Sequence, residues 1–141
     1  MKYILFAVLL FASINVNAAV SRPTINTPES FQDAFSSARE DTLLCDTLMT
    51  AYAADSAPTA EKTHSVDYVC GRMFFALSLL IDAPTPLALT VIDTQEEVDQ
   101  FTKTVNTLER LKAFVNVYGI DKFPILNRVA LDVVQSRSPT I

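Results

Sequence analysis

The sequence predicts an all-α protein: a small bundle of about four helices, of which the first two form an antiparallel hairpin joined by one disulfide. Three observations lead to this prediction. Glycine occurs only twice in 141 residues and the prolines lie mostly at the edges of apolar segments, which favours long helices over tight turns. Apolar residues recur three or four positions apart along most of the chain. The two cysteines lie on the first two predicted helices.

The first 18 residues have the pattern of a secretory signal peptide. Lys2 gives a positive start, an apolar run extends from Tyr3 to Ile14, and small residues occupy positions −3 and −1 of a cut after Ala18. We therefore expect the protein to act outside the cytoplasm, in the periplasm or as a secreted protein. Residues 19–141 then form a single helical domain, which is long enough to bury one core without help from metals.

The first two helices have clear boundary signals. Thr27 is a good N-cap with Pro28 at the first helical position, and the first helix is expected to reach about Ala54. The second helix is expected over residues 58–81, where it ends before a Pro-Thr-Pro breaker. Its uninterrupted apolar stretch, Met73 to Ile81, is about half of the ~20 residues that a bilayer requires. We therefore predict a core helix and no membrane span.

The remainder of the chain predicts two further helices. Leu87 to Ile92 has a strand-like composition, but no second strand is available to pair with it, so a short helix or a buried extended connector is expected. Thr94 and Glu97 form a capping box that opens the third helix, and Gly119 ends it. The last helix is expected over Asp121 to Arg137, with a proline in its first turn. The apolar stripe of the third helix is Val98, Phe101, Val105, Leu108, Leu111, Val115 and Tyr118, and that of the last helix is Leu126, Val129, Ala130, Val133 and Val134.

The numbers of Cys45 and Cys70 sum to 115, and a hairpin folded midway between them places residues with this sum opposite each other. The same sum pairs Phe35 with Leu80, Ala38 with Leu77, Thr42 with Met73, and Met49 with Val66. The cysteines thus fall in the register that the hydrophobic pattern sets, and we predict a structural disulfide. A catalytic thiol activated by His64 is disfavoured, because this only histidine lies six residues before Cys70 and points to another side of the helix. Gly71 is interpreted as a small residue that allows close helix approach.

No catalytic or cofactor signature is found. The chain lacks a G-x-S-x-G elbow, a phosphate-binding glycine loop and an H-E-x-x-H motif, so we predict a protein that is not an enzyme and uses no cofactor or metal. Asp46 and Arg72 are expected to form at most an ordinary surface ion pair. Acids also gather where the third helix begins, but the helix dipole alone favours them there and the spacing lacks the glycine of an EF-hand. These acids are Asp93, Glu96, Glu97 and Asp99.

The charge of the chain restricts its partners. Loss of the signal peptide removes Lys2 and changes the formal net charge from −5 to −6. This balance disfavours nucleic acid and anionic membranes and favours a basic protein partner. The segments 55–62 and 82–94 are the best candidates for exposed docking loops. Their candidate partner-binding residues are Asp55, Glu61, Lys62, Asp82 and Asp93.

Several apolar residues lie off the main stripes, namely Phe74, Phe75, Leu79, Phe114, Val117, Ile125 and Leu131. Either their helices are central in the bundle, or they leave a patch for a partner or for a small apolar ligand.

We therefore predict an extracytoplasmic, non-enzymatic binding protein, most specifically an inhibitor or immunity-type protein that neutralises another protein. In size and address the chain resembles the small periplasmic immunity proteins that block cell-wall-degrading effectors. Some of those proteins are helical homodimers, so a homodimer is left open here. The alternative function is a carrier of a small apolar ligand in an interhelical cavity. The residues expected to line that cavity are Phe74, Phe75, Leu79 and Phe114.

Overall fold

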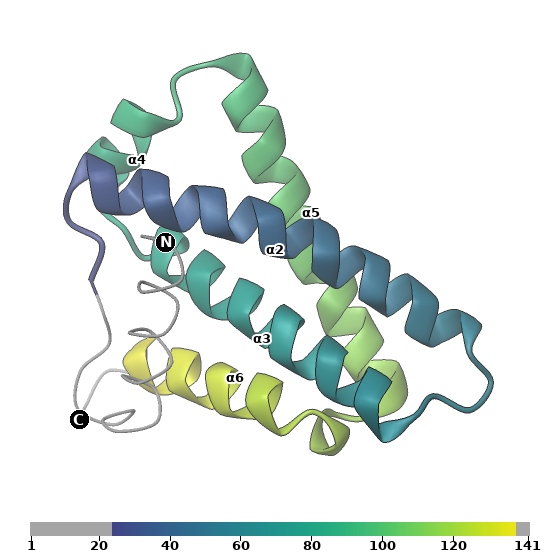
Figure 1. The fold of residues 1–141 in the computed structure, drawn as a ribbon. Helices are drawn as coiled ribbons and strands as arrows, with labels where there is room; N and C mark the ends of the chain where they lie inside the picture. The colour runs from purple at the N-terminus through teal and green to yellow at the C-terminus, as the bar shows by residue number, and fades with distance from the viewer. Residues whose placement is uncertain (1–23, 138–141) are drawn as a thin grey trace.

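The computed structural model describes residues 24–137, and within this range the chain is helical with no strand. The predicted signal peptide lies outside the described residues. Figure 1 shows the order of the elements along the chain. These elements are α2 (Pro28–Ala54), α3 (Ala60–Ile81), α4 (Thr85–Val91), α5 (Gln95–Tyr118), a 3₁₀ turn η1 (Ile120–Lys122) and α6 (Pro124–Arg137). The all-α prediction and the Cys45–Cys70 disulfide are both confirmed.

The starts of α2 and α3 follow from local capping. At the start of α2 the Thr27 hydroxyl accepts the Ser30 N–H at 3.1 Å, and the Ser30 hydroxyl oxygen accepts the Thr27 N–H at 3.2 Å. At the start of α3 the Thr59 hydroxyl accepts the Lys62 N–H at 3.1 Å. Each hydroxyl satisfies a backbone donor that has no partner within its own helix.

The contact between α2 and α3 is the most extensive between any two elements. Cys45 and Cys70 cross-link them with Cα atoms 5.0 Å apart, well within the range for a disulfide, and both cysteines are fully buried. All members of the four pairs predicted from the cysteine register are also buried. Neither cysteine is a free thiol, so the nucleophile that the sequence left as an alternative is absent.

Helix α3 is the central helix, with contacts to α2, α5 and α6. Phe75 and Leu79, which lie off its main stripe, are both buried, so the second apolar face of α3 is covered. By length and composition α3 could cross a membrane, but 67% of its most apolar 18-residue window is buried inside the protein. This burial is typical of a core helix.

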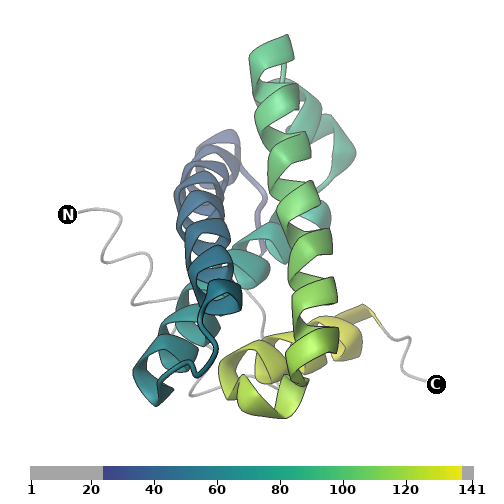
Figure 2. The same ribbon diagram turned by 90° about the vertical axis from the view of Figure 1, so that its right-hand side faces the viewer.

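The segment between α3 and α5 is helical. Of the two alternatives for Leu87 to Ile92, a short helix is observed, although it begins earlier, at Thr85. No residue of α4 is fully buried; Leu87, Ala88 and Val91 pack against the core from its edge. Figure 2 shows α4 at one end of α5 and α6 at the other. Helix α4 is therefore an apolar helix held on the outside of the fold.

Both ends of α5 follow the expected signals with one difference. The Thr94 hydroxyl accepts the Glu97 N–H at 3.2 Å, but it also donates to the Glu97 carboxylate at 2.8 Å, so that carboxylate does not cap the Thr94 backbone as a full capping box requires. At the other end Gly119 has φ +95°, a conformation that favours glycine. Val98 is a correction to the predicted stripe, because 43% of it is exposed.

The predicted start of the last helix is wrong by three residues. Residues 120–122 form the 3₁₀ turn, and α6 begins at Pro124, where the fixed φ of proline suits a first helical position. Phe123 is fully buried just before it, which fixes where the chain turns. Val134 is 61% exposed and so does not belong to the buried stripe. Val117 and Leu131, also apolar in the sequence, are exposed as well.

Candidate functional site

A bidentate ion pair connects α2 with α3 next to the disulfide. Arg72 donates from Nε and Nη2 to the two carboxylate oxygens of Asp41, at 2.9 and 2.6 Å. This corrects the expected pairing of Arg72 with Asp46, which instead pairs with Arg110 of α5 at 2.9 Å. The Asp41 carboxylate raises the pKa of Arg72 by accepting its hydrogen bonds, and the guanidinium also lies 5.4 Å from the Tyr68 ring centre.

A second polar contact, which sequence reasoning missed, positions α6. The buried carboxylate of Asp67 accepts the backbone N–H groups of Ile125 and Leu126 at 3.0 and 2.8 Å. It thus caps α6 from a different helix, 58 residues earlier in the chain. One turn along α3, Gly71 leaves so little room that an added Cβ would lie 2.8 Å from Cγ2 of Ile125. The interpretation of Gly71 as a close-approach residue is thereby supported, with α6 as the helix that approaches.

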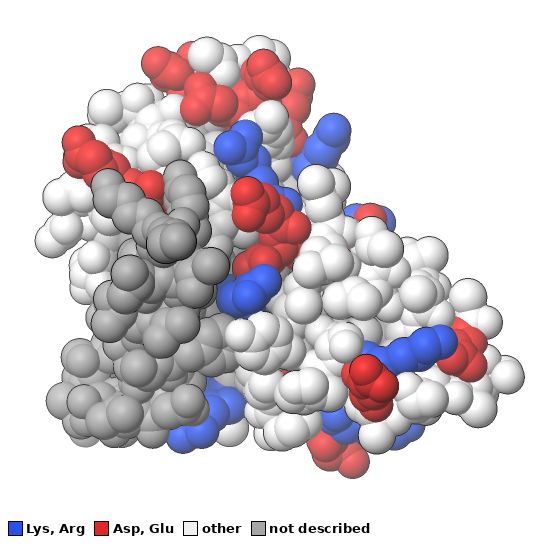
Figure 3. All heavy atoms as spheres, in the orientation of Figure 1, with Lys and Arg blue, Asp and Glu red and all other residues white. Residues whose placement is uncertain are grey.

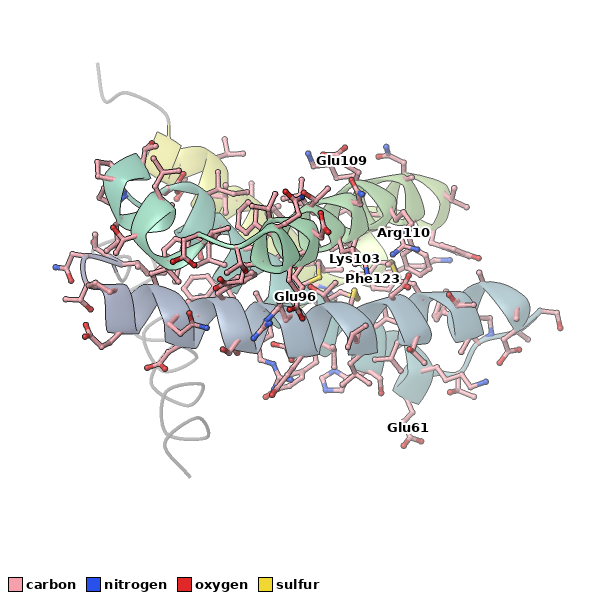
Figure 4. The ribbon with its side chains drawn as sticks, turned by 90° about the horizontal axis from the view of Figure 1, so that it is seen from above. Glu61, Glu96, Lys103, Glu109, Arg110 and Phe123 are labelled. Carbon is pink, nitrogen blue, oxygen red and sulfur yellow. A yellow bond between two sulfur atoms is a disulfide. The ribbon has the colours of Figure 1, made fainter. Side chains whose placement is uncertain are left out.

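The five predicted partner-binding residues lie at opposite ends of the molecule. Asp55, Glu61 and Lys62 are at the connection between α2 and α3, where Glu61 points away from the protein (Figure 4). Lys62 donates to Asp55 at 2.6 Å, and this bond, together with the Ala57 N–H, lowers the pKa of the Asp55 carboxyl. The carboxylate of Asp55 is therefore already paired with Lys62. Asp82 and Asp93 are exposed at the other end, on either side of α4.

Charge is distributed unequally between these two ends. One end of the molecule is formed by residues 24–38 and 73–102. These segments contain the beginning of α2, the end of α3, α4 and the beginning of α5, and they hold no Lys or Arg. Phe35 and Phe101 join these parts, with ring centres 5.9 Å apart. We call this region the acidic end; its seven acids are Glu29, Asp33, Asp82, Asp93, Glu96, Glu97 and Asp99. The other described residues, 39–72 and 103–137, hold nine Lys and Arg against nine Asp and Glu. The acidic end therefore holds seven acids and no cation, and Arg39 and Lys103 lie at its border.

The acidic end also exposes apolar side chains. Ile81 is 45% exposed, Leu89 of α4 is 68% exposed, and Val98 of α5 is 43% exposed. Figure 3 shows red atoms gathered at the top of the molecule, over the beginning of α5, next to uncoloured surface. Exposed apolar side chains and an excess of carboxylates are thus found at the same end of the molecule, and both are features of a docking surface.

The four residues predicted to line an apolar cavity belong to the core or pack against it, but their surroundings differ. Phe75 and Leu79 are buried core residues at 4% and 5% exposure. Phe114 packs in an aromatic cluster, with its ring centre 5.4 Å from that of Tyr52. Phe74 lines a shallow apolar pocket of about 160 Å³ next to α5 and α6. This volume is below the ~300–1,000 Å³ that is usual for ligand pockets.

Among residues 24–137, no group of three or more His, Cys, Asp or Glu side chains is placed to hold a metal ion. His64 is exposed, with its ring 6.2 Å from that of Tyr68. Comparison of the chain with protein-family models, with curated proteins and with solved structures finds no match.

Proposed function

We propose that this chain is an extracytoplasmic, non-enzymatic binding protein of the inhibitor or immunity type, which docks a cationic partner protein on its acidic end. One observation carries the proposal: the described acidic excess is confined to that end, while the remainder of the described chain is balanced. A one-sided charge of this kind orients an approaching protein of opposite charge and raises its association rate, with an effect that falls as salt rises.

The exposed apolar residues complete the docking surface. Carboxylates provide orientation and specificity, but affinity usually depends on a few apolar or aromatic anchors at the centre of an interface. Leu89 is suited to be such an anchor, because it is 68% exposed on a helix that lies at the edge of the core. The expected partner surface is therefore an apolar depression surrounded by Lys and Arg.

The proposed framework is a bundle of about four helices in which α2 and α3 form an antiparallel hairpin. The opposite directions of the two ribbons in Figure 1, the buried disulfide and the Asp41–Arg72 pair support this arrangement. A disulfide also favours an oxidising compartment outside the cytoplasm. A cross-linked framework holds the docking surface in its bound form before the partner arrives, which reduces the entropy lost on binding.

Site-specific photo-crosslinking in the producing cell tests the proposal. A benzophenone amino acid replaces Leu89 in one variant and Val117, which is 76% exposed on α5 outside the acidic end, in a matched control. We expect a covalent adduct with one protein at position 89 and none at position 117. In the position-89 variant, D93N/E96Q should reduce the adduct at least fivefold, whereas E61Q/E109Q, which removes the same charge elsewhere, should leave it within twofold.

Two crosslinking results would contradict this proposal, and the identity of the bound molecule provides a third test. One is an adduct at position 117 with none at position 89. The other is a position-89 adduct that is equally insensitive to both charge-neutralising pairs, because orientation by the acidic end would then have no effect. Recovery of a lipid without a protein adduct would also overturn it and support a carrier instead.

A further inference from the structure

A polar cleft lies between α2 and α5 beside the acidic end. Its volume is about 530 Å³, which falls within the usual range for ligand sites. Its lining includes Arg39, Glu40 and Thr42 of α2 and Gln100, Lys103 and Thr104 of α5.

The cleft exists because small side chains separate two points of contact. At one point Arg39 donates a hydrogen bond to the Gln100 side chain, and at the other Asp46 pairs with Arg110. Between them, Thr42 and Thr104 turn their hydroxyls back to backbone carbonyls of their own helices, at 2.5 and 3.0 Å. Neither side chain therefore bridges the space, and the cleft stays open.

Two cations and one anion line this space. Lys103 is exposed and makes no ion pair with a described residue, and Figure 4 shows it on the side of α5 that also carries Arg110. Arg39 stacks 5.0 Å from the Phe35 ring centre, and its only hydrogen bond among the described residues goes to Gln100. Its Nε is the one buried side-chain nitrogen or oxygen in the described range without a partner. Nε is itself buried, but Nη2 makes no hydrogen bond with a described residue, and a carboxylate is the acceptor that best matches such a guanidinium donor.

We infer that the α2–α5 cleft binds a carboxylate group, held by Lys103 and Arg39. Glu40 at the same cleft repels a simple anion but accepts N–H donors, so a carboxylate carried on a peptide complements all three charged groups. The cleft is distinct from the exposed apolar surface of α4 and does not depend on the function proposed for that surface. Both a peptide with an acidic side chain and a small free carboxylate share the required chemistry.

Titration of the ¹⁵N-labelled protein tests this inference, with two probes that separate the sources. N-acetyl-L-glutamate, which has two carboxylates, represents a small free solute, and a glycine–serine pentapeptide with two Glu residues and blocked ends, which has the same charge, represents a peptide. We expect amide shifts confined to the cleft, at least tenfold weaker binding in K103Q, and no more than a twofold change in K112Q, a matched exposed lysine of α5. E40Q should tighten N-acetyl-L-glutamate several-fold, because a repulsive charge is removed.

Tighter binding of the pentapeptide would assign the site to a peptide partner, and tighter binding of N-acetyl-L-glutamate would assign it to a small solute. The inference is overturned if neither probe shifts the cleft amides, if K103Q binds like the unaltered protein, or if N-acetyl-L-lysine amide, a cation of similar size, produces the same shifts. Lys103 is exposed, so K103Q is expected to fold normally, which the unchanged spectrum away from the cleft would verify.

Discussion

Replacement of Gly71 by alanine sets two energies of opposite sign against each other. In the middle of a helix, glycine is less favourable than alanine by about 1 kcal/mol, so the substitution alone would stabilise α3. The new Cβ, however, would lie 2.8 Å from Cγ2 of Ile125, whereas carbon atoms pack best at about 3.5–4.0 Å. One of the two helices must shift to relieve this contact.

The start of α6 cannot shift without weakening the hydrogen bonds that Asp67 accepts from it. Ile125 is branched at Cβ, which restricts its rotamers, and its N–H and that of Leu126 are held by Asp67 at 3.0 and 2.8 Å. Overpacking of this kind typically costs about 1–3 kcal/mol. Since this exceeds the gain in helix propensity, we expect G71A to destabilise the protein by about 1 kcal/mol.

Urea unfolding of the oxidised protein measures this difference. With a slope of about 1–3 kcal/mol/M, a loss of 1 kcal/mol lowers the midpoint by roughly 0.3–1 M. A double-mutant cycle identifies the cause: in an I125A background the clash is absent, so G71A should become neutral or stabilising by up to about 1 kcal/mol. If G71A stabilises the otherwise unaltered protein, or if its effect is the same in both backgrounds, the steric explanation is wrong.

Three further substitutions test the framework. The C45A/C70A pair opens a loop with a sequence separation of 25, for which chain entropy predicts a loss of about 3.5 kcal/mol in the free energy of unfolding. Circular dichroism should show a Tm lower by roughly 10–15 °C. A loss below about 1 kcal/mol would contradict the structural role of the disulfide. D67N keeps the shape of the side chain but turns an NH₂ toward one of two backbone donors. We therefore expect the free energy of unfolding to fall by about 2 kcal/mol and the amide hydrogens where α6 begins to exchange faster. Unchanged exchange there would argue against the cap. R72A leaves the Asp41 carboxylate, whose side chain is 7% exposed, without its cation. We expect the free energy of urea unfolding to fall by about 2 kcal/mol, and not by more, because the Arg72 side chain is 28% exposed. The double variant D41N/R72L should be less destabilised than R72A, and the reverse order would refute the pairing.

The boundaries of the helices could be predicted because they depend on neighbours in the sequence. Thr27 and Thr59 cap groups three residues away, and Gly119 ends α5 through its own backbone conformation. Such contacts form wherever the local sequence allows them. The exception is the start of α6, where Pro124 was a local signal but was assigned to the first turn and not to its beginning, and where the cap, Asp67, comes from another helix.

The polar partners could not be predicted, because they depend on the rotation of one helix against another. Spacing suggested Asp46 for Arg72, but the observed partner is Asp41, five residues earlier on α2. For Asp67 the available signal was an acid within an apolar stretch of the second helix, which requires a buried partner without identifying it. The surroundings of Phe74 and Phe114 were also beyond sequence reasoning, because packing alone places one at a small surface pocket and the other in an aromatic cluster.

The sequence by itself determined the all-α class, the disulfide and the number of acids, because helical periodicity, cysteine register and composition are properties of the linear chain. Only the tertiary structure decided where the charge lies. Residues 24–38 hold two acids and residues 73–102 hold five, and the 34 residues between them carry three cations. Folding brings the two segments together, with Arg39 and Lys103 at their border, and a field that orients a partner depends on this distribution in space as well as on the net charge.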